Sequence, residues 1–153
     1  MIEITHDPLN PEAVTRKVTG PGNGAVVTFL GTTRDSTSGR AVLRLEYEGY
    51  EPMAAQKLAE ISAEIRERWG IENVAVAHRL GRLEIGEVSL VVAVASPHRG
   101  EAFAACQYAV DRIKQTVPIW KKEFFEDGEV WVGSQDDCWT PEPAEATPTR
   151  ADI

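Results

Sequence analysis

The segment Ser96-Pro97-His98-Arg99 is the first candidate for chemistry, because it joins an expected strand to an expected helix. Backbone N–H groups at a helix N-terminus are free to bind an anion, and the cationic groups of His98 and Arg99 would reinforce that binding. A capping turn with solvated side chains is the more common interpretation of such a segment. The residues themselves leave both interpretations open.

Three lysines form the second candidate, with Lys114 in an expected helix and Lys121 and Lys122 in the strand that follows Pro118. Successive side chains of a strand point to opposite faces, so only one of Lys121 and Lys122 shares a face with any one pocket. Lysines near other cations can serve as proton donors or nucleophiles. The alternative is structural, because lysines favour helix C-termini and protect edge strands.

The third candidate is the segment 29–34, in which an expected strand runs into a polar loop. Gly31 permits close backbone approach, and Phe29 together with Arg34 suits a flat, charged ligand. Thr32 and Thr33 add hydroxyl groups between them. A strand end with a surface Arg is again the more common alternative.

Other reactive residue types indicate structural roles. Cys106 falls on an apolar helical stripe and is expected to be a buried thiol, and Cys138 lies near the C-terminus. The two cysteines lack metal-ligand spacing, so no metal site is predicted. His78 lies inside an expected strand and is expected to be structural. No cofactor is implied.

The elements that must position these residues alternate between strand and helix patterns. Apolar residues recur at helical spacing over residues 52–69, where Gly70 ends the helix, and over residues 103–117, where Pro118 ends it. A short helix is expected to begin at Asn10-Pro11. Strands are predicted over residues 24–31, 42–48, 73–80 and 88–96, and a hairpin at Asp127-Gly128 joins residues 119–126 to 129–132.

This order predicts one α+β domain over residues 1–133, with a mostly antiparallel sheet, two long amphipathic helices and a C-terminal hairpin. Residues 134–153 are rich in proline and acidic residues and are expected to form a mobile tail. The apolar runs are too short to span a membrane, no secretory signal is visible, and the cytoplasm is the expected compartment.

The net charge of −8 argues against nucleic-acid binding. It is unevenly placed, because residues 123–153 hold nine acidic residues and one Arg, whereas residues 1–122 hold 15 of each sign. The body of the domain is therefore neutral and can carry a local basic pocket for an anionic substrate.

The distance between the basic clusters has a consequence for assembly. His98 and Lys114 are 16 residues apart along one expected helix, a span of about 24 Å. No small ligand bridges that distance within one chain. If the clusters serve one pocket, a second copy of the chain must complete it, which predicts a symmetric dimer with composite sites.

Five segments in this order resemble the large, catalytic subunit family of molybdopterin synthase. They are residues 24–34, 45–48, 78–87, 96–99 and 114–123. The resemblance implies an α/β-hammerhead fold and a role in molybdenum cofactor biosynthesis. It implies a small ubiquitin-like partner whose C-terminal Gly-Gly thiocarboxylate donates two sulfurs to cyclic pyranopterin monophosphate. It also implies a heterotetramer built around a homodimer of large subunits.

The resemblance also assigns roles to individual residues. Lys114 and Lys121 match the family's essential lysines and are the expected catalytic residues, with Lys114 the more directly involved. The expected substrate-binding residues include both lysines together with Phe29, Thr32, Thr33, Arg34, His98, Arg99, Lys122 and Glu123.

The sequence departs from the family at two places. Members often carry a basic residue shortly after the position of Val132, where this chain has Gly133-Ser134-Gln135-Asp136-Asp137. Lys122 stands where an Arg is also common.

Two other functions were weighed from the residues taken alone: a non-catalytic dimeric module that binds a partner tail or a phosphorylated metabolite, and a phosphate-ester hydrolase. The hydrolase function finds no support in the sequence, because the sequence shows neither a metal cluster nor a nucleophile–base pair.

Overall fold

The computed structural model describes residues 1–132. The predicted tail over residues 134–153, with Cys138, lies outside the described residues, as does the domain boundary expected at residue 133. Within the described part, the strands form two separate sheets of four strands each and a two-stranded ribbon.

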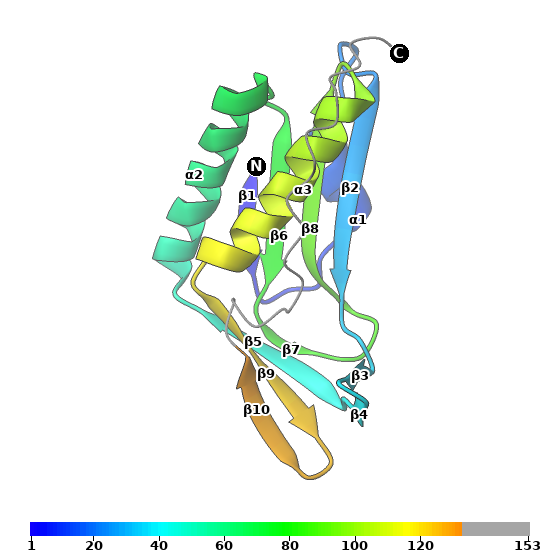
Figure 1. The fold of residues 1–153 in the computed structure, drawn as a ribbon, viewed down its shortest axis with the longest axis vertical. Coiled ribbons are helices and arrows are strands. Elements are labelled where there is room, and N and C mark those ends of the chain that lie inside the picture. The colour runs from blue at the N-terminus through cyan, green and yellow to red at the C-terminus, as the bar shows by residue number, and fades with distance from the viewer. Residues whose placement is uncertain (133–153) are drawn as a thin grey trace.

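The sheet with the longest strands, which we call the larger sheet, forms the centre of the molecule. Its strand order in space is β1-β6-β8-β2 (Figure 1). These strands are β1 (Ile2–Thr5), β6 (Val74–Arg79), β8 (Val88–Ser96) and β2 (Ala25–Thr32). Strands β6, β8 and β2 are antiparallel neighbours, as the sequence predicts, whereas β1 pairs in parallel with β6. Strand β1 was not predicted, because four residues at a sheet edge show no clear alternation.

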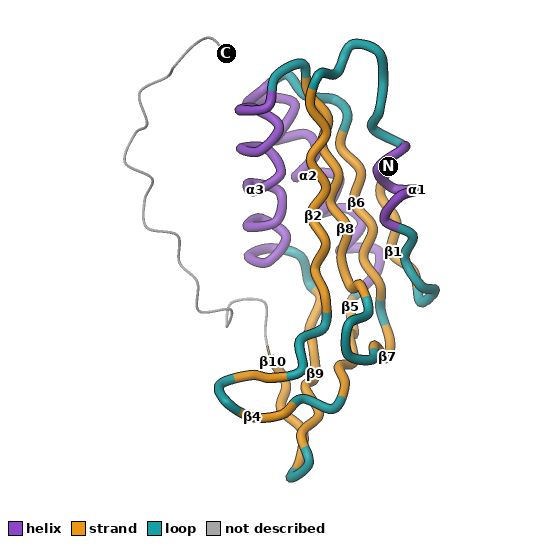
Figure 2. Tube along the Cα trace, turned by 90° about the vertical axis from the view of Figure 1, so that its right-hand side faces the viewer, coloured by secondary structure: helices purple, strands orange, loops and turns teal. Residues whose placement is uncertain are grey.

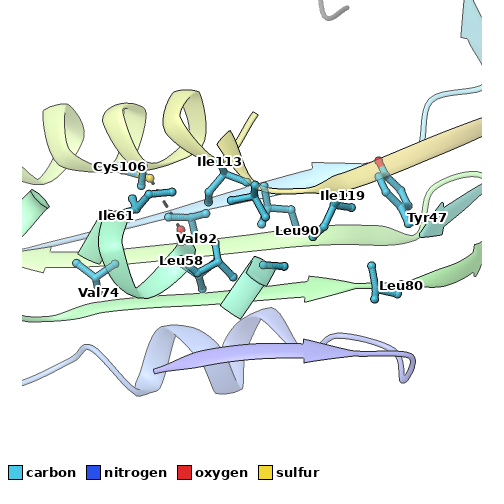
Figure 3. Close-up of a cluster of buried hydrophobic side chains, with 14 of the residues drawn as sticks. Tyr47, Leu58, Ile61, Val74, Leu80, Leu90, Val92, Cys106, Ile113 and Ile119 are labelled. Atoms are coloured by element: carbon cyan, nitrogen blue, oxygen red, sulfur yellow. Dashed lines mark hydrogen bonds between the residues drawn. The ribbon is translucent and has the colours of Figure 1, made fainter. Parts of the chain in front are cut away.

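Helices cover both faces of this sheet, as Figure 2 shows in side view. Helices α2 (Glu51–Trp69) and α3 (Arg99–Thr116) pack on one face and enclose the main core. The short helix α1 (Pro11–Arg16) packs on the other face against small residues of β6 and β8. The main core includes side chains from both long helices and from the sheet (Figure 3).

The two long helices begin and end where the sequence predicts. In α2 the buried residues Ala54, Leu58, Ile61 and Ile65 form the expected stripe, and Gly70 ends the helix with φ +67°. Gly70 adopts the left-handed conformation that glycine tolerates best. Helix α3 ends at Thr116, because Pro118 lacks the N–H that a further turn requires.

The other sheet, which we call the smaller sheet, has the strand order β10-β9-β5-β7, and all of its neighbouring strands are antiparallel. Its strand β9 follows directly after α3 in the chain. Its strands are β5 (Arg44–Gly49), β7 (Gly81–Leu83), β9 (Ile119–Phe125) and β10 (Gly128–Val132). The hairpin predicted at Asp127-Gly128 is confirmed. Strand β7 and the ribbon of β3 (Ser36–Thr37) and β4 (Arg40–Ala41) lie between the strands that the sequence predicts.

We predict that Leu58→Ala lowers the free energy of unfolding by about 2–5 kcal/mol, because Leu58 is completely buried between α2 and the sheet. Leu43→Ala is the matched control, since the Leu43 side chain is 45% exposed and its truncation opens no cavity. Urea unfolding of both variants measures the difference. Equal losses for the two would contradict the assignment of Leu58 to the core.

Candidate active site

Strand β9 presents its residues to two faces, and this alternation separates the two adjacent lysines. Ile119, Glu123 and Phe125 are buried on the inner face, which Lys121 shares. Lys122 lies on the outer face with Trp120 and Phe124. The expectation that only one of the two lysines shares a given face is therefore confirmed by the order of residues along β9.

On the inner face, Lys121 pairs with the buried carboxylate of Glu123. The Lys121 Nζ lies 3.6 Å from Glu123 Oε1, and the side chains are 15% and 5% exposed. A carboxylate at this depth is costly unless a cation faces it. Glu123 therefore holds the Lys121 ammonium at a defined place on the inner face of β9.

The residue opposite Lys121 on the neighbouring strand is Tyr47. The ring of Tyr47 packs edge-to-face against the imidazole of His78, with ring centroids 5.2 Å apart. Figure 3 shows Tyr47 at one end of the buried core. Strand β6 of the larger sheet and strands β5 and β9 of the smaller sheet therefore meet at this place.

Lys114 approaches the same place from the last turn of α3. Burial lowers the pKa of His78 to about 4, the hydrogen bond to the Arg79 carbonyl opposes that change, and the positive charge of Lys114 lowers the pKa further. The His78 Nδ1 lies 2.9 Å from the Arg79 carbonyl oxygen, so Nδ1 carries the proton and donates it. His78 is thus a neutral imidazole beside the Lys114 ammonium.

We call Lys114, Lys121, Glu123, His78 and Tyr47 the lysine cluster. It joins the end of α3 to the inner face of the smaller sheet, with two cations, one carboxylate and one neutral imidazole. Such an arrangement can stabilise negative charge that develops on a bound substrate. Tyr47 and His78 were not among the predicted site residues, and only their place in the fold identifies them.

Lys122 is engaged on the outer face. Its Nζ lies 2.9 Å from Glu129 Oε1 and 5.0 Å from the centre of the Trp131 ring. Strand β9 therefore separates Lys122 from the lysine cluster, and its role as a substrate-binding residue stays a prediction.

The segment after β2 has a buried anchor and exposed neighbours. Thr33 is buried, and both its N–H and its hydroxyl donate to the Glu87 carbonyl oxygen, at 3.0 and 3.1 Å. Thr32 and Arg34 are exposed on either side of it. Phe29 is half-buried and packs against the main core. Thr33 therefore fixes the loop that carries Arg34, and only Thr32 and Arg34 are openly available to a ligand.

The predicted anion-binding segment lies at the opposite end of α3 from Lys114. His98 is the N-cap residue and Arg99 the first residue of the helix, and both are exposed. The helix has 18 residues, a length of about 27 Å. One chain thus brings Lys114 and Lys121 to the same place but leaves His98 and Arg99 far from them.

Two classes of site find no support within residues 1–132. No group of three or more His, Cys, Asp and Glu side chains there could hold a metal ion. Cys106 is buried as expected, and burial raises the pKa of its thiol to about 11, which disfavours the nucleophilic thiolate.

None of the helices within residues 1–132 is long and apolar enough to cross a membrane.

We predict that the free energy of unfolding falls by about 3 kcal/mol between pH 6.5 and 4, owing to His78 alone. Its pKa is about 4 in the folded chain and about 6.5 in the unfolded chain. In that window the unfolded chain binds the extra proton, so lowering the pH favours unfolding.

Urea unfolding from pH 7 to 4 tests this dependence. His78→Gln should lose that part of the slope, whereas His6→Gln should keep it, because the His6 side chain is 69% exposed. The same slope in both variants would show that His78 does not titrate as described.

The comparisons with known proteins agree with this geometry. The family model described as "MoaE protein" matches residues 4–116. The molybdopterin synthase catalytic subunit of Bacillus subtilis is 55% identical over 133 residues, which are 87% of this chain and 85% of the relative. The human catalytic subunit is 40% identical over 139 residues, 91% of this chain and 74% of the relative.

Solved structures agree as well. The crystal structure of molybdopterin synthase from Staphylococcus aureus matches with a TM-score of 0.82 and 45% identity, over 86% of this chain and 96% of that chain. A complex of subunits 1 and 2 of molybdopterin-converting factor from Helicobacter pylori matches with a TM-score of 0.71 and 19% identity, over 86% and 89%. The second likeness is one of fold alone.

These findings confirm the resemblance and the α+β fold class expected from the sequence. This chain belongs to the family of molybdopterin synthase catalytic subunits, the enzymes that convert a precursor into molybdopterin in molybdenum cofactor biosynthesis.

Proposed function

We propose that the chain transfers sulfur to cyclic pyranopterin monophosphate from the C-terminal thiocarboxylate of a small ubiquitin-like partner subunit. The observation that carries this proposal is the lysine cluster, in which the two lysines of the family motif come to one place from different elements. The reaction is proposed to take place in the cytoplasm, whose reducing conditions keep a buried thiol such as Cys106 reduced.

The chemistry needs positive charge near the partner's C-terminus. The thiocarboxylate sulfur first attacks a carbon of the substrate, and the carbon–oxygen bond at that carbon breaks, so that an oxygen leaving group departs with the bonding electron pair. The sulfur is then bonded to the substrate while it is still attached to the partner's acyl carbon. Water then adds to that acyl carbon, its carbon–sulfur bond breaks, and the partner leaves as a carboxylate with release of a proton. The added water puts negative charge on the carbonyl oxygen, and a fixed ammonium group stabilises it.

The two lysines come from different elements, Lys114 from the last turn of α3 and Lys121 from β9, and we assign them different roles. Lys121 is opposed by the buried carboxylate of Glu123, which orients its ammonium and offsets its charge. The positive charge of Lys114 acts on the neighbouring imidazole of His78 and lowers its pKa. We assign stabilisation of the developing charge to Lys114, and a supporting electrostatic role to Lys121 with Glu123 as its positioning residue.

The remaining predicted residues are assigned to substrate binding. Arg34, His98 and Arg99 are exposed basic residues, and they suit the phosphate and the polar edge of the pterin. Because His98 and Arg99 lie at the far end of α3, we assign them to the pocket of a second copy of the chain. Phe29, Thr32, Thr33 and Lys122 are kept as binding residues on the strength of the family motif.

A partner subunit fits this arrangement. The Helicobacter pylori structure of similar fold is described as a protein–protein complex of subunits 1 and 2 of molybdopterin-converting factor. We propose the corresponding assembly here, a heterotetramer in which the partner's C-terminal Gly-Gly reaches the lysine cluster. Glycines suit such a tail, because they let an extended backbone enter a narrow site.

We predict that Lys114→Ala lowers the rate of sulfur transfer by about 10²- to 10³-fold, the effect of removing one group that stabilises a developing oxyanion. The measurement mixes the chain with a thiocarboxylated partner and the cyclic pterin, and follows the dithiolene product. Lys57→Ala is the matched control, since Lys57 is an exposed lysine of α2 paired with Glu60. Near-normal transfer by Lys114→Ala would refute the catalytic assignment.

A further inference from the structure

The turn between β7 and β8, residues 84–87, holds the loop that carries Arg34. Thr33 is 3% exposed, and its N–H and its hydroxyl both donate to the Glu87 carbonyl oxygen. In return, the Gly86 N–H donates to the Thr33 carbonyl oxygen at 2.9 Å. The N–H, the hydroxyl and the carbonyl of Thr33 are therefore all bonded to what we call the 84–87 turn.

The residue on the other side of Arg34 is anchored as well. The Asp35 carbonyl oxygen accepts a hydrogen bond from the Val42 N–H at 2.8 Å, and Val42 is buried. Arg34 thus lies between two anchored residues, whereas Arg34 itself is exposed. The backbone that carries Arg34 has a defined place, from which the guanidinium group can reach a ligand.

The carboxylate of Glu87 holds the 84–87 turn in shape. Its Oε1 accepts a hydrogen bond from the Glu84 N–H at 2.9 Å, and its Oε2 accepts one from the Arg79 guanidinium. The Glu84 N–H and the Arg79 guanidinium both lower the pKa of Glu87, so its side chain is ionised at neutral pH. Because each oxygen faces a donor, this place requires a group with two acceptor oxygens.

Arg79 connects the 84–87 turn to the lysine cluster. It follows His78 in β6, and successive side chains of a strand point to opposite faces. His78 packs against Tyr47 on one face, whereas the Arg79 side chain is 13% exposed on the other face and pairs with Glu87. One end of β6 therefore holds both the lysine cluster and, through Glu87, the loop of Arg34.

We propose that Glu87 is a positioning residue for substrate binding, which fixes the place of Arg34 through the 84–87 turn and Thr33. The inference rests on the proposed function, because it takes Arg34 to bind the anionic groups of the cyclic pterin. Both carboxylate oxygens of Glu87 are engaged within the chain. Glu87 therefore acts through Arg34 and not by contact with the substrate.

The anchored loop affects affinity more than chemistry. A loop that is held in place before the substrate arrives reduces the conformational freedom that binding must remove. Arg34 is assigned to the phosphate and the polar edge of the pterin, and these groups do not react. Loss of the anchor should therefore raise the KM for the cyclic pterin and leave kcat unchanged.

Glu87→Gln tests the role of the carboxylate. An amide has one acceptor oxygen, so either the Glu84 N–H or the Arg79 guanidinium would face the NH₂ group of the glutamine. Glu84→Gln is the matched control, because it makes the same change in the same turn. The Glu84 side chain is 53% exposed and pairs with the exposed Arg82. Circular dichroism confirms that each variant is folded.

Amide hydrogen exchange measures the anchor of the loop without substrate. In Glu87→Gln the amides of Thr33 and Gly86 should exchange about 10-fold faster than in the wild type, because the turn that pairs with them is loosened. The amide of Val92, in the middle of β8, should be unchanged. In Glu84→Gln all three amides should exchange as in the wild type.

Sulfur transfer with the thiocarboxylated partner, measured at increasing concentrations of the cyclic pterin, tests the effect on the substrate. Glu87→Gln should raise the KM for the cyclic pterin by about 3- to 30-fold, the coupling expected within one hydrogen-bonded network, and keep kcat. In an Arg34→Ala background, Glu87→Gln should cause no further rise. A wild-type KM in Glu87→Gln, or the same rise in both backgrounds, would overturn the proposal.

Thr33→Val tests the same path at a second point, and it serves if Glu87→Gln does not fold. Valine has nearly the shape of threonine but lacks the hydroxyl that donates to the Glu87 carbonyl oxygen. The KM for the cyclic pterin should rise by about 2- to 10-fold, the effect of one lost hydrogen bond, and should not rise further in the Arg34→Ala background. A folded Thr33→Val variant with a wild-type KM would contradict the proposal.

The two kinds of measurement separate this inference from the proposed function. If the amides exchange as expected but the wild type transfers no sulfur, the anchor of the loop stands, and the proposed function fails together with the role of Glu87 toward the substrate. If the wild type transfers sulfur but Glu87→Gln keeps both the exchange rates and the KM of the wild type, the proposed function stands and this inference is wrong.

Discussion

The rigidity of α3 is the constraint on which the rest of the site depends. A helix of 18 residues holds its two ends apart, at about 27 Å. Its N-terminal end carries His98 and Arg99, and its last turn carries Lys114. Neither set can move toward the other without breaking a helix that is packed against α2 and the sheet. A site that uses both sets must therefore be assembled from two chains.

The elements that follow α3 determine which side chains lie near Lys114, at the C-terminal end of the helix. Only Val117 and Pro118 separate α3 from β9, so the strand begins where the helix stops. The alternation of β9 then selects Lys121 for the inner face and turns Lys122 outward. Glu123 follows two residues later on the inner face and provides the counter-charge for Lys121. Chain connectivity and strand geometry are thus enough to bring the two lysines together.

Much of the fold was predictable because its longest elements have strong local patterns. The stripe from Ala54 to Ile65 and the Asp127-Gly128 turn are signals of this kind. Strands β1 and β7 were missed, because they are short and owe their structure to pairing with β6 and β5. The division into two sheets was missed for the same reason, since pairing between distant segments leaves no local pattern.

The site shows the same division. Motifs and the alternation of strand residues pointed to Lys114, Lys121 and Glu123, which the fold brings into the lysine cluster. Tyr47 and His78 were not predicted as members of this cluster, because nothing in their local sequence distinguishes them from other residues of a strand. Their place beside Lys114 and Lys121 depends on how β5, β6 and β9 meet in space. The separation of His98 from Lys114 was predictable, because helix length follows from residue count.

The most direct test of a site shared between two chains is complementation between inactive variants. Lys114→Ala and Arg99→Ala are each expected to be inactive in sulfur transfer when assayed alone. After the two are unfolded together and refolded, half the dimers are mixed and one of their two sites is intact, so about a quarter of wild-type activity should return. Activity that stays at the level of the separate variants would contradict the account of a site shared between two chains.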